Sequence, residues 1–365
     1  MTDIHLDNKR LVWAAMRDIA ECSSSDLANA LAAVYHTDAH WRGSHPWNEL
    51  HGIQAIEHTV WAELKRSFPD LERRDDIVIA GTYESRDYVA MVGHLVGRFQ
   101  ADWQGLPATD QVIYLRYGEV HQVINGKIVQ STVLLDVMDF IRQAGFWPMP
   151  PSLGQEGLWA APFNGNGRLL SAQDPSESAQ SLALTMAMQA TLGAYDDTQG
   201  AGRAGLLTMP QSQYWHPKMM WYGPSSIGTA RGLEGFIDCH QLPFRSVFVN
   251  NPTSREGFPK AIDPATGQPI LPAKHYIRIG DGAFSATGGW PSRRLLHSGG
   301  NWLGLPATQR TVTLRVMDFY AADSGRIREN WVPIDMINML LQLDVDILAR
   351  VRQQFAPKRQ GSSKH

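Results

Sequence analysis

The heptapeptide WQGLPAT at residues 103–109 returns as WLGLPAT at residues 302–308, and this repeat is the strongest pattern in the chain. The alignment continues without a gap, so that residues 103–136 match residues 302–335 with 12 identities in 34 positions. Self-similarity over such a length predicts two copies of one structural unit.

A second, weaker alignment lies upstream and pairs residues 36–68 with residues 216–248. It matches Trp41 with Trp221, and it precedes the first alignment in both copies. The aligned residues of the two copies lie fewer positions apart in this alignment than in the first one. The second copy therefore carries a net insertion between the two aligned segments, which we place in the Pro- and Gly-rich stretch 250–273. We predict a first domain at 1–146, a linker at 147–181, a second domain at 182–355 and a disordered basic tail at 356–365.

Both copies show the same predicted order of elements. Apolar spacing favours helices in the first copy, and β-rich runs separated by turn residues favour strands. The first copy is predicted to have helices at 9–21, 26–35 and 52–68 and strands at 36–41, 77–85, 88–100, 111–123 and 127–135. The second copy is predicted to have strands at 213–221, 274–280, 283–300, 309–321 and 326–334 and helices at 232–247 and 335–355. We therefore predict an α+β fold of two tandem cone-shaped domains, each a curved antiparallel sheet with helices packed on its concave side.

Composition excludes several classes of protein. The 365 residues carry a net charge of -3, which argues against an electrostatic nucleic-acid binder. Two cysteines are too few for a disulfide framework. No stretch has the composition of a signal peptide or a membrane span, so we expect a cytoplasmic protein without membrane contact. The 12 tryptophans suit either a core or the walls of an aromatic pocket.

The repeated segments resemble the SnoaL-like polyketide cyclases of the nuclear-transport-factor-2-like superfamily. The resemblance rests on WLGLPAT at 302–308, GRIRENW at 325–331 and Asp335, supported by GLEGF at 232–236. It is better in the second copy, because Gln130 and Thr132 replace Glu329 and Trp331 in the first. The resemblance implies an Asp that performs acid–base steps in an aldol closure without a cofactor.

The last strand of the second copy supplies the first catalytic candidates. Residues of one parity share a face, so Glu329, Trp331 and Asp335 lie together, opposite Asn330 and Val332. If the carboxylate face lines the cone, burial raises the pKa of Asp335 toward the range of a general acid or base. Asp136 is its counterpart in the first copy. The alternative is that both aspartates cap the helices that follow them.

Histidines and aromatic residues complete the predicted site. His297 lies just before the repeated loop and is predicted to assist in proton transfer or to hold an enolate. The residues predicted to contact the substrate are Trp221, Trp302, Trp331, Glu329, His216, His240, Arg315, His94 and His36. The alternative for the histidines is a structural role, and for Arg315 it is an ion pair.

No cofactor or metal is predicted. His36, Asp38 and His40 form the one run that suits a metal, but Lys218 and Met220 replace two of its members in the second copy. The glycines at 200–205 match a dinucleotide-binding pattern without the strand that it requires, so we exclude that function.

We predict a cofactor-free lyase or isomerase that acts on a hydrophobic, carbonyl-bearing small molecule in the second domain. Two alternatives stay open: a hydrolase or dehydratase that uses the same groups, and a non-catalytic small-molecule-binding or scaffold protein. We expect the two domains to form an internal pseudo-dimer, and the sequence does not decide whether the chain also forms a homodimer.

Overall fold

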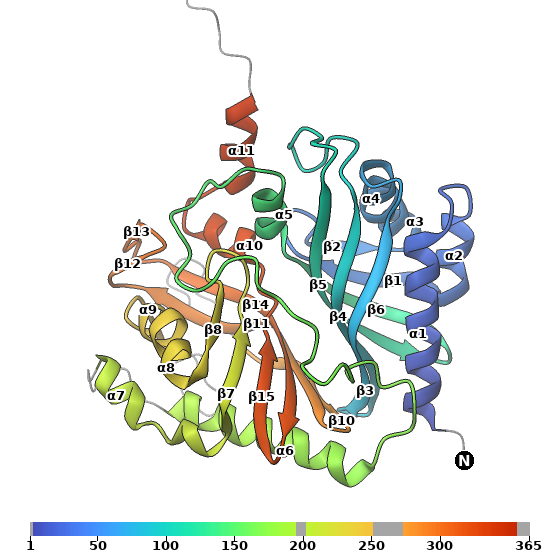
Figure 1. The fold of residues 1–365 in the computed structure, drawn as a ribbon. Helices are drawn as coiled ribbons and strands as arrows, with labels where there is room; N and C mark the ends of the chain where they lie inside the picture. Colours follow the sequence, from blue (N-terminus) through green and yellow to red (C-terminus); the bar gives the residue numbers. More distant parts are fainter. Residues whose placement is uncertain (1–2, 195–201, 251–272, 356–365) are drawn as a thin grey trace, which may run out of the picture.

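The computed structural model describes residues 3–194, 202–250 and 273–355, which form two domains side by side (Figure 1). Most of the predicted insertion and the whole predicted tail lie outside the described residues. Among the described residues, no helix is both long enough and apolar enough to cross a membrane.

The first domain is a six-stranded sheet with helices on its concave side. Its strand order is β2-β1-β6-β5-β4-β3, antiparallel except for the β1–β6 pair. Its elements are α1 (Ile4–Glu21), α2 (Leu27–Val34), β1 (Tyr35–Gly43), β2 (Glu49–His51), α3 (Ile53–Ile56), a π-helical turn (Glu57–Trp61), α4 (Ala62–Ser67), β3 (Glu72–Tyr83), β4 (Arg86–Arg98), β5 (Val112–Ile124), β6 (Lys127–Leu135) and α5 (Val137–Gln143).

The second domain repeats this arrangement with the strand order β8-β7-β15-β14-β11-β10, and β9 pairs with β11. Its elements are α6 (Pro175–Ala194), α7 (Gly202–Thr208), a 3-10 turn (Pro210–Gln213), β7 (Trp215–Tyr222), β8 (Thr229–Arg231), α8 (Gly232–Phe236), a π-helical turn (Ile237–Gln241), α9 (Leu242–Arg245), β9 (Phe248–Asn250), β10 (His275–Asp281), β11 (Phe284–His297), β12 (Asn301–Trp302), β13 (Leu305–Pro306), β14 (Thr311–Asp323), β15 (Arg326–Trp331), α10 (Met336–Gln342) and α11 (Ile347–Phe355). Helix α6 begins inside the range predicted as linker, and α7 covers part of the glycine-rich segment.

Strand pairing follows both sequence alignments. Trp41 pairs with Ser131 in the first sheet, and their counterparts Trp221 and Asn330 pair in the second. The β5–β6 hairpin turns at Asn125 and Gly126, whose φ angles of 50° and 71° are those of a tight hairpin turn. The turn between β14 and β15 uses Ser324 and Gly325 in the same way. The predicted α+β fold of two tandem domains is therefore confirmed.

The two sheets pack against each other through their convex faces. The shared core contains Ile79 and Val120 from the first domain and Ile279 and Phe319 from the second. Gly118 marks a close approach of the two sheets, because a Cβ there would lie 2.5 Å from Pro333 Cγ. Each sheet thus has two buried faces, one against its own helices and one against the other sheet.

Two aspartates connect the domains in matching ways. Asp136 caps α5 by accepting from the Asp139 amide, and it also accepts from the Ser225 amide of the second domain. Asp335 caps α10 and accepts from the His45 amide of the first domain at 2.9 Å. His45 and Ser225 are aligned in the repeat, so each domain donates the same loop amide to the cap of the other.

Candidate functional site

The second domain contains an open cavity of about 390 Å³ between its sheet and its helices. Its walls are mostly apolar and aromatic. Lining residues come from α6, β7, α8 to α9, β11, β14, β15 and α10, and they include Trp215, Trp221, Phe236, Phe244, Phe248, Trp302, Leu314, Val316 and Met339. A concave apolar site with a few polar groups is the usual form of a small-molecule site.

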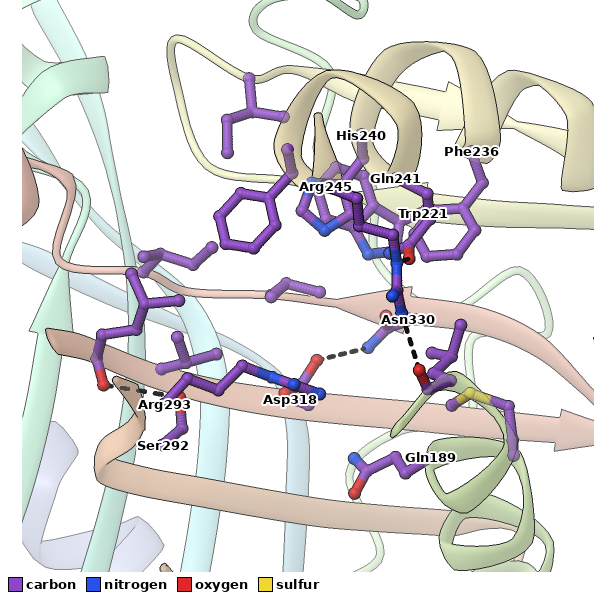
Figure 2. Close-up of a pocket in the computed structure, with 18 of the residues that line it drawn as sticks. Gln189, Trp221, Phe236, His240, Gln241, Arg245, Ser292, Arg293, Asp318 and Asn330 are labelled. Atoms are coloured by element: carbon purple, nitrogen blue, oxygen red, sulfur yellow. Dashed lines mark hydrogen bonds between the residues drawn. The ribbon is translucent and has the colours of Figure 1, made fainter. Parts of the chain in front are cut away.

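Asp318 is the carboxylate of this cavity (Figure 2). It lies on β14, and the Asn330 side-chain amide of β15 donates to its Oδ1 at 3.5 Å. Burial raises the pKa of Asp318 to about 6, although hydrogen bonds from Asn330 and Tyr320 and the charge of Arg293 act in the opposite direction. Near neutral pH Asp318 can therefore both accept and return a proton.

A chain of polar groups orients the Tyr320 hydroxyl. Gln189 on α6 donates through Nε2 to the Tyr320 hydroxyl oxygen at 3.0 Å and to Thr287 Oγ1 at 3.0 Å. Because the hydroxyl oxygen receives this bond, its own proton is available to Asp318, which lies two residues earlier on the same strand. Asp318 is thus held between donors from two strands.

His240 forms the opposite side of the cavity (Figure 2). Its ring stacks on Trp221 with centroids 4.3 Å apart. Burial lowers the pKa of His240 to about 3, and the charges of Arg245 and Arg293 act in the same direction. At neutral pH His240 is therefore an uncharged imidazole. Its N–H can donate a hydrogen bond, but the ring does not act as a cationic acid.

The rim of the cavity carries further nitrogen groups from β10. His275 and Arg278 line it, and burial lowers the pKa of His275 to about 4. Among the described residues, His275 Nδ1 and Arg278 Nε have no hydrogen-bond partner. These atoms are free to bind polar groups of a ligand.

The matching position inside the cone of the first domain holds a cavity of only about 20 Å³, lined by Trp41, Val60, Arg73, Tyr117 and Glu119 among others. Arg73 forms buried ion pairs with Asp75 and Glu119, and the ring of His121 lies beside the same glutamate. The cone is filled by its own charged and aromatic side chains.

A sequence profile of the family described as SnoaL-like polyketide cyclase matches residues 14–144 and 296–343, one segment in each domain. The chain thus carries two segments that match the SnoaL-like polyketide cyclase family, one in each domain. A search of curated proteins finds no significant match.

Solved structures of single SnoaL-like domains are similar to parts of this chain. A protein of Jannaschia sp. CCS1 assigned as a SnoaL-like polyketide cyclase is 17% identical, with a TM-score of 0.35, covering 41% of this chain and 98% of its own. IdmH of Streptomyces antibioticus, assigned as a polyketide cyclase, is 18% identical, with a TM-score of 0.32, covering 38% and 99%. AclR of Streptomyces galilaeus, assigned as a hydroxylase, is 16% identical, with a TM-score of 0.32, covering 39% and 98%.

Three of the predicted contact residues lie in the cavity of the second SnoaL-like domain. Trp221, Trp302 and His240 all line it. His297 does not, although its ring stacks on Phe248, which does. The Thr308 amide donates to His297 Nδ1 at 3.2 Å, which holds this ring against the repeated loop.

The expectation that Asp335 faces the cone is wrong. Strand β15 alternates as predicted, but Asn330, Val332 and Ile334 line the cavity, and Glu329, Trp331 and Asp335 point the other way. Trp331 donates to the Ala160 carbonyl of the linker, and Glu329 accepts from the Phe163 amide. The carboxylate face is buried against the linker and the first domain, which the sequence alternation cannot distinguish from burial in a cone.

The remaining predicted residues also lie outside the cavity, and most hold the fold together. Asp136 and Asp335 act as caps between the domains, which is the alternative stated for them. Arg315 pairs with Asp335 at 3.0 Å, His94 pairs with Asp76 at 3.2 Å, and His216 accepts from Arg328. His36 is exposed and accepts from the Asp38 amide.

Sequence reasoning missed Asp318, Asn330 and Tyr320. One pattern could have found Asp318, because the repeat aligns it with Glu119 and thus keeps an acidic residue on the same face of the same strand. An acidic residue repeated on a strand otherwise rich in apolar residues indicates a polar group inside both cones. The tyrosine and the asparagine carry no such repeat, since His121 and Ser131 replace them.

Proposed function

We propose that the second domain is a cofactor-independent acid–base enzyme, a polyketide-cyclase-like lyase or isomerase, with Asp318 as its proton-transferring group. The observation that carries this proposal is the burial of Asp318 in an open apolar cavity, with its pKa raised to about 6. A carboxyl group in such a setting is matched to proton abstraction near neutral pH.

The substrate that fits is a hydrophobic molecule with a carbonyl group. Trp221, Phe236 and Trp302 offer flat apolar surfaces for it. Ionised Asp318 would take a proton from the carbon beside the carbonyl, and the electrons of that C–H bond would form an enolate. The N–H of neutral His240 or the guanidinium of Arg293 would stabilise the negative oxygen.

The second half of the reaction returns the proton. If the enolate carbon attacks another carbonyl of the same molecule, a C–C bond forms, and Asp318 protonates the resulting alkoxide. If no second carbonyl is in reach and the enolate is conjugated with a double bond, Asp318 protonates the far carbon of that conjugated system, and the product is a double-bond isomer. Either route restores the carboxylate.

Hydrogen exchange in deuterated water tests the proposal. A panel of enolisable aromatic and polyketide-like ketones is incubated with the wild type and with Asp318→Asn, and exchange at the acidic carbon is followed by NMR. We expect the variant to be slower by about 10²- to 10⁴-fold. Asp335→Asn is the matched control, because asparagine keeps the helix cap and the site lies outside the cavity.

Three outcomes separate the alternatives. Exchange that survives in Asp318→Asn and disappears in Asp335→Asn would overturn the assignment of the site. Thermal stabilisation of both wild type and Asp318→Asn by ketones that never exchange would identify a binding protein instead of an enzyme. The proposal is supported if the wild type and Asp335→Asn both catalyse exchange and Asp318→Asn does not.

A further inference from the structure

Two histidines and a glutamate meet at the edge of the first sheet, in the domain without the open cavity. Strands β1 and β2 run antiparallel, with His40 opposite His51 and Arg42 opposite Glu49. One potential ligand atom from each of His40, Glu49 and His51 lies within 4.8 Å of the other two. The sequence run had grouped His40 with His36 and Asp38 instead, because Glu49 and His51 join it only through strand pairing.

The three side chains lie against one another at the sheet edge. The rings of His40 and His51 are stacked, with centroids 4.5 Å apart and planes within 2°. His40 Nε2 is buried and has no hydrogen-bond partner among the described residues, although Glu49 Oε2 lies 3.5 Å away. The long contact between His40 and Glu49 and the convergence of all three groups suit a ligand that the three side chains can share.

We propose that His40, Glu49 and His51 bind a divalent transition-metal ion, with Zn²⁺ as the preferred ion. Two imidazole nitrogens and one carboxylate oxygen are a ligand set that zinc takes in proteins, with a further position left to water. Ligand bonds of about 2.0–2.2 Å in a tetrahedron require neighbouring ligand atoms to be a little over 3 Å apart. The His40–Glu49 separation nearly meets this, and the exposed side chains of Glu49 and His51 are free to rotate inward.

Arg42, a neighbouring cation among the residues that the structure describes, is directed away from this group. Arg42 donates to Thr132 Oγ1 at 2.9 Å, and its guanidinium lies over the rings of Tyr276 and Trp290 of the second domain. It is therefore held at the seam between the domains, and the side of the cluster that faces solvent stays open to an ion.

The second domain provides a built-in comparison. Met220, Thr229 and Arg231 occupy the aligned positions on β7 and β8, and Arg231 donates to Met220 Sδ at 3.4 Å. A methionine, a hydroxyl and a guanidinium offer no site for Zn²⁺. We therefore expect one ion per chain, bound by the first domain alone.

Calorimetric titration of the chelator-treated full-length protein with ZnCl₂ tests the site. We expect one equivalent of Zn²⁺ to bind, and Co²⁺ in its place to give the visible absorption of a protein-bound ion. His51→Ala and Glu49→Gln should each lose the one-to-one binding. Both residues are exposed, so these variants are expected to keep the melting temperature of the metal-free wild type.

His36→Ala is the matched control, since His36 lies on the same strand, is exposed and stands outside the cluster. It should bind Zn²⁺ as the wild type does. The proposal is wrong if the wild type binds no stoichiometric ion, if His51→Ala binds as tightly as the wild type, or if His36→Ala loses the ion as well.

Discussion

The two cones of this protein share one architecture and differ in what fills them. In the first, Glu119 is bound by Arg73 and touched by His121, and the cavity beside it measures about 20 Å³. In the second, Asp318 stands at the aligned position and faces about 390 Å³ of space. The same strand position thus holds a structural ion pair in one domain and an accessible carboxyl group in the other.

The difference traces to a few neighbouring substitutions. Strand pairing shows that His275 occupies the position of Asp75. Asp75 pairs with Gly93 on β4, and His275 pairs with Gly289, the equivalent glycine on β11. Counting back two residues from this pair brings Ala273, which precedes β10, into line with Arg73 of the first domain. The second cone therefore lacks the buried ion pair that occupies the first. Arg293 lines its cavity, and its charge lowers the pKa of Asp318 without offsetting the effect of burial.

The pKa values of the two acids show the same contrast. Burial alone would raise the pKa of Glu119, but Arg73 and His121 more than offset it and hold the value at about 2. Burial dominates at Asp318, where the value is about 6. One carboxylate is held permanently charged, and the other changes its charge near neutral pH.

The largest effect on stability is expected from Glu119→Ala. Removing one partner of a buried ion pair leaves Arg73 with Asp75 alone, which should cost about 3 kcal/mol of the free energy of unfolding. Urea titration followed by circular dichroism measures this. Asp318→Ala is the paired control and should cost far less. Equal losses in the two variants would contradict the distinction between a filled cone and an open one.

A smaller effect with a distinctive pH dependence is expected from Asp318→Asn. Because the pKa of Asp318 is raised on folding, ionisation destabilises the native state as the pH rises from about 4 through about 6. The asparagine variant escapes this cost, so it should match the wild type at pH 4 and be more stable by about 2 kcal/mol at pH 8. Melting temperatures across this range check the sign.

Glu119 should show the opposite trend. Its pKa is lowered on folding, so the stability it contributes is present above about pH 4.5 and is lost as the pH falls toward about 2. The difference between wild type and Glu119→Ala should therefore shrink in acid, whereas that between wild type and Asp318→Asn grows as the pH rises from about 4 to about 6 and then stays constant. A common pH profile for the two variants would refute the contrast.

The smallest effects are expected at the reciprocal caps. Asp136→Ala and Asp335→Ala each remove a helix cap and one contact between the domains, which should cost about 1–2 kcal/mol. The Asn variants keep the cap and should lose less. Neither Ala variant should slow ketone exchange per folded molecule, because neither aspartate lines the cavity. If the Asp335→Ala variant is fully folded but no longer exchanges the ketone proton, Asp335 would be a catalytic residue and the assignment to Asp318 would be wrong.

The sequence alone determined the order of elements and the pairing of the two copies. The repeat that joins Trp103 to Trp302 and Asp136 to Asp335 carries through to the strand registers, because aligned residues in a repeat occupy equivalent positions in the sheet. The glycines at 126 and 325 located the hairpins, since both tolerate the left-handed backbone that a two-residue turn requires. The alternation of residues along β15 also correctly placed Asn330 and Trp331 on opposite faces of the sheet.

Only the tertiary structure decided which of those faces is the inside of the cone. A strand buried on one face reveals its core by alternation, but β15 is buried on both, by its own helices and by the linker and the first domain. Glu329 and Asp335 therefore looked like the lining of a pocket although they bind backbone amides. The contacts that make Asp318 a candidate acid and His40, Glu49 and His51 a candidate metal site join residues distant in the chain, which spacing along a single strand cannot show.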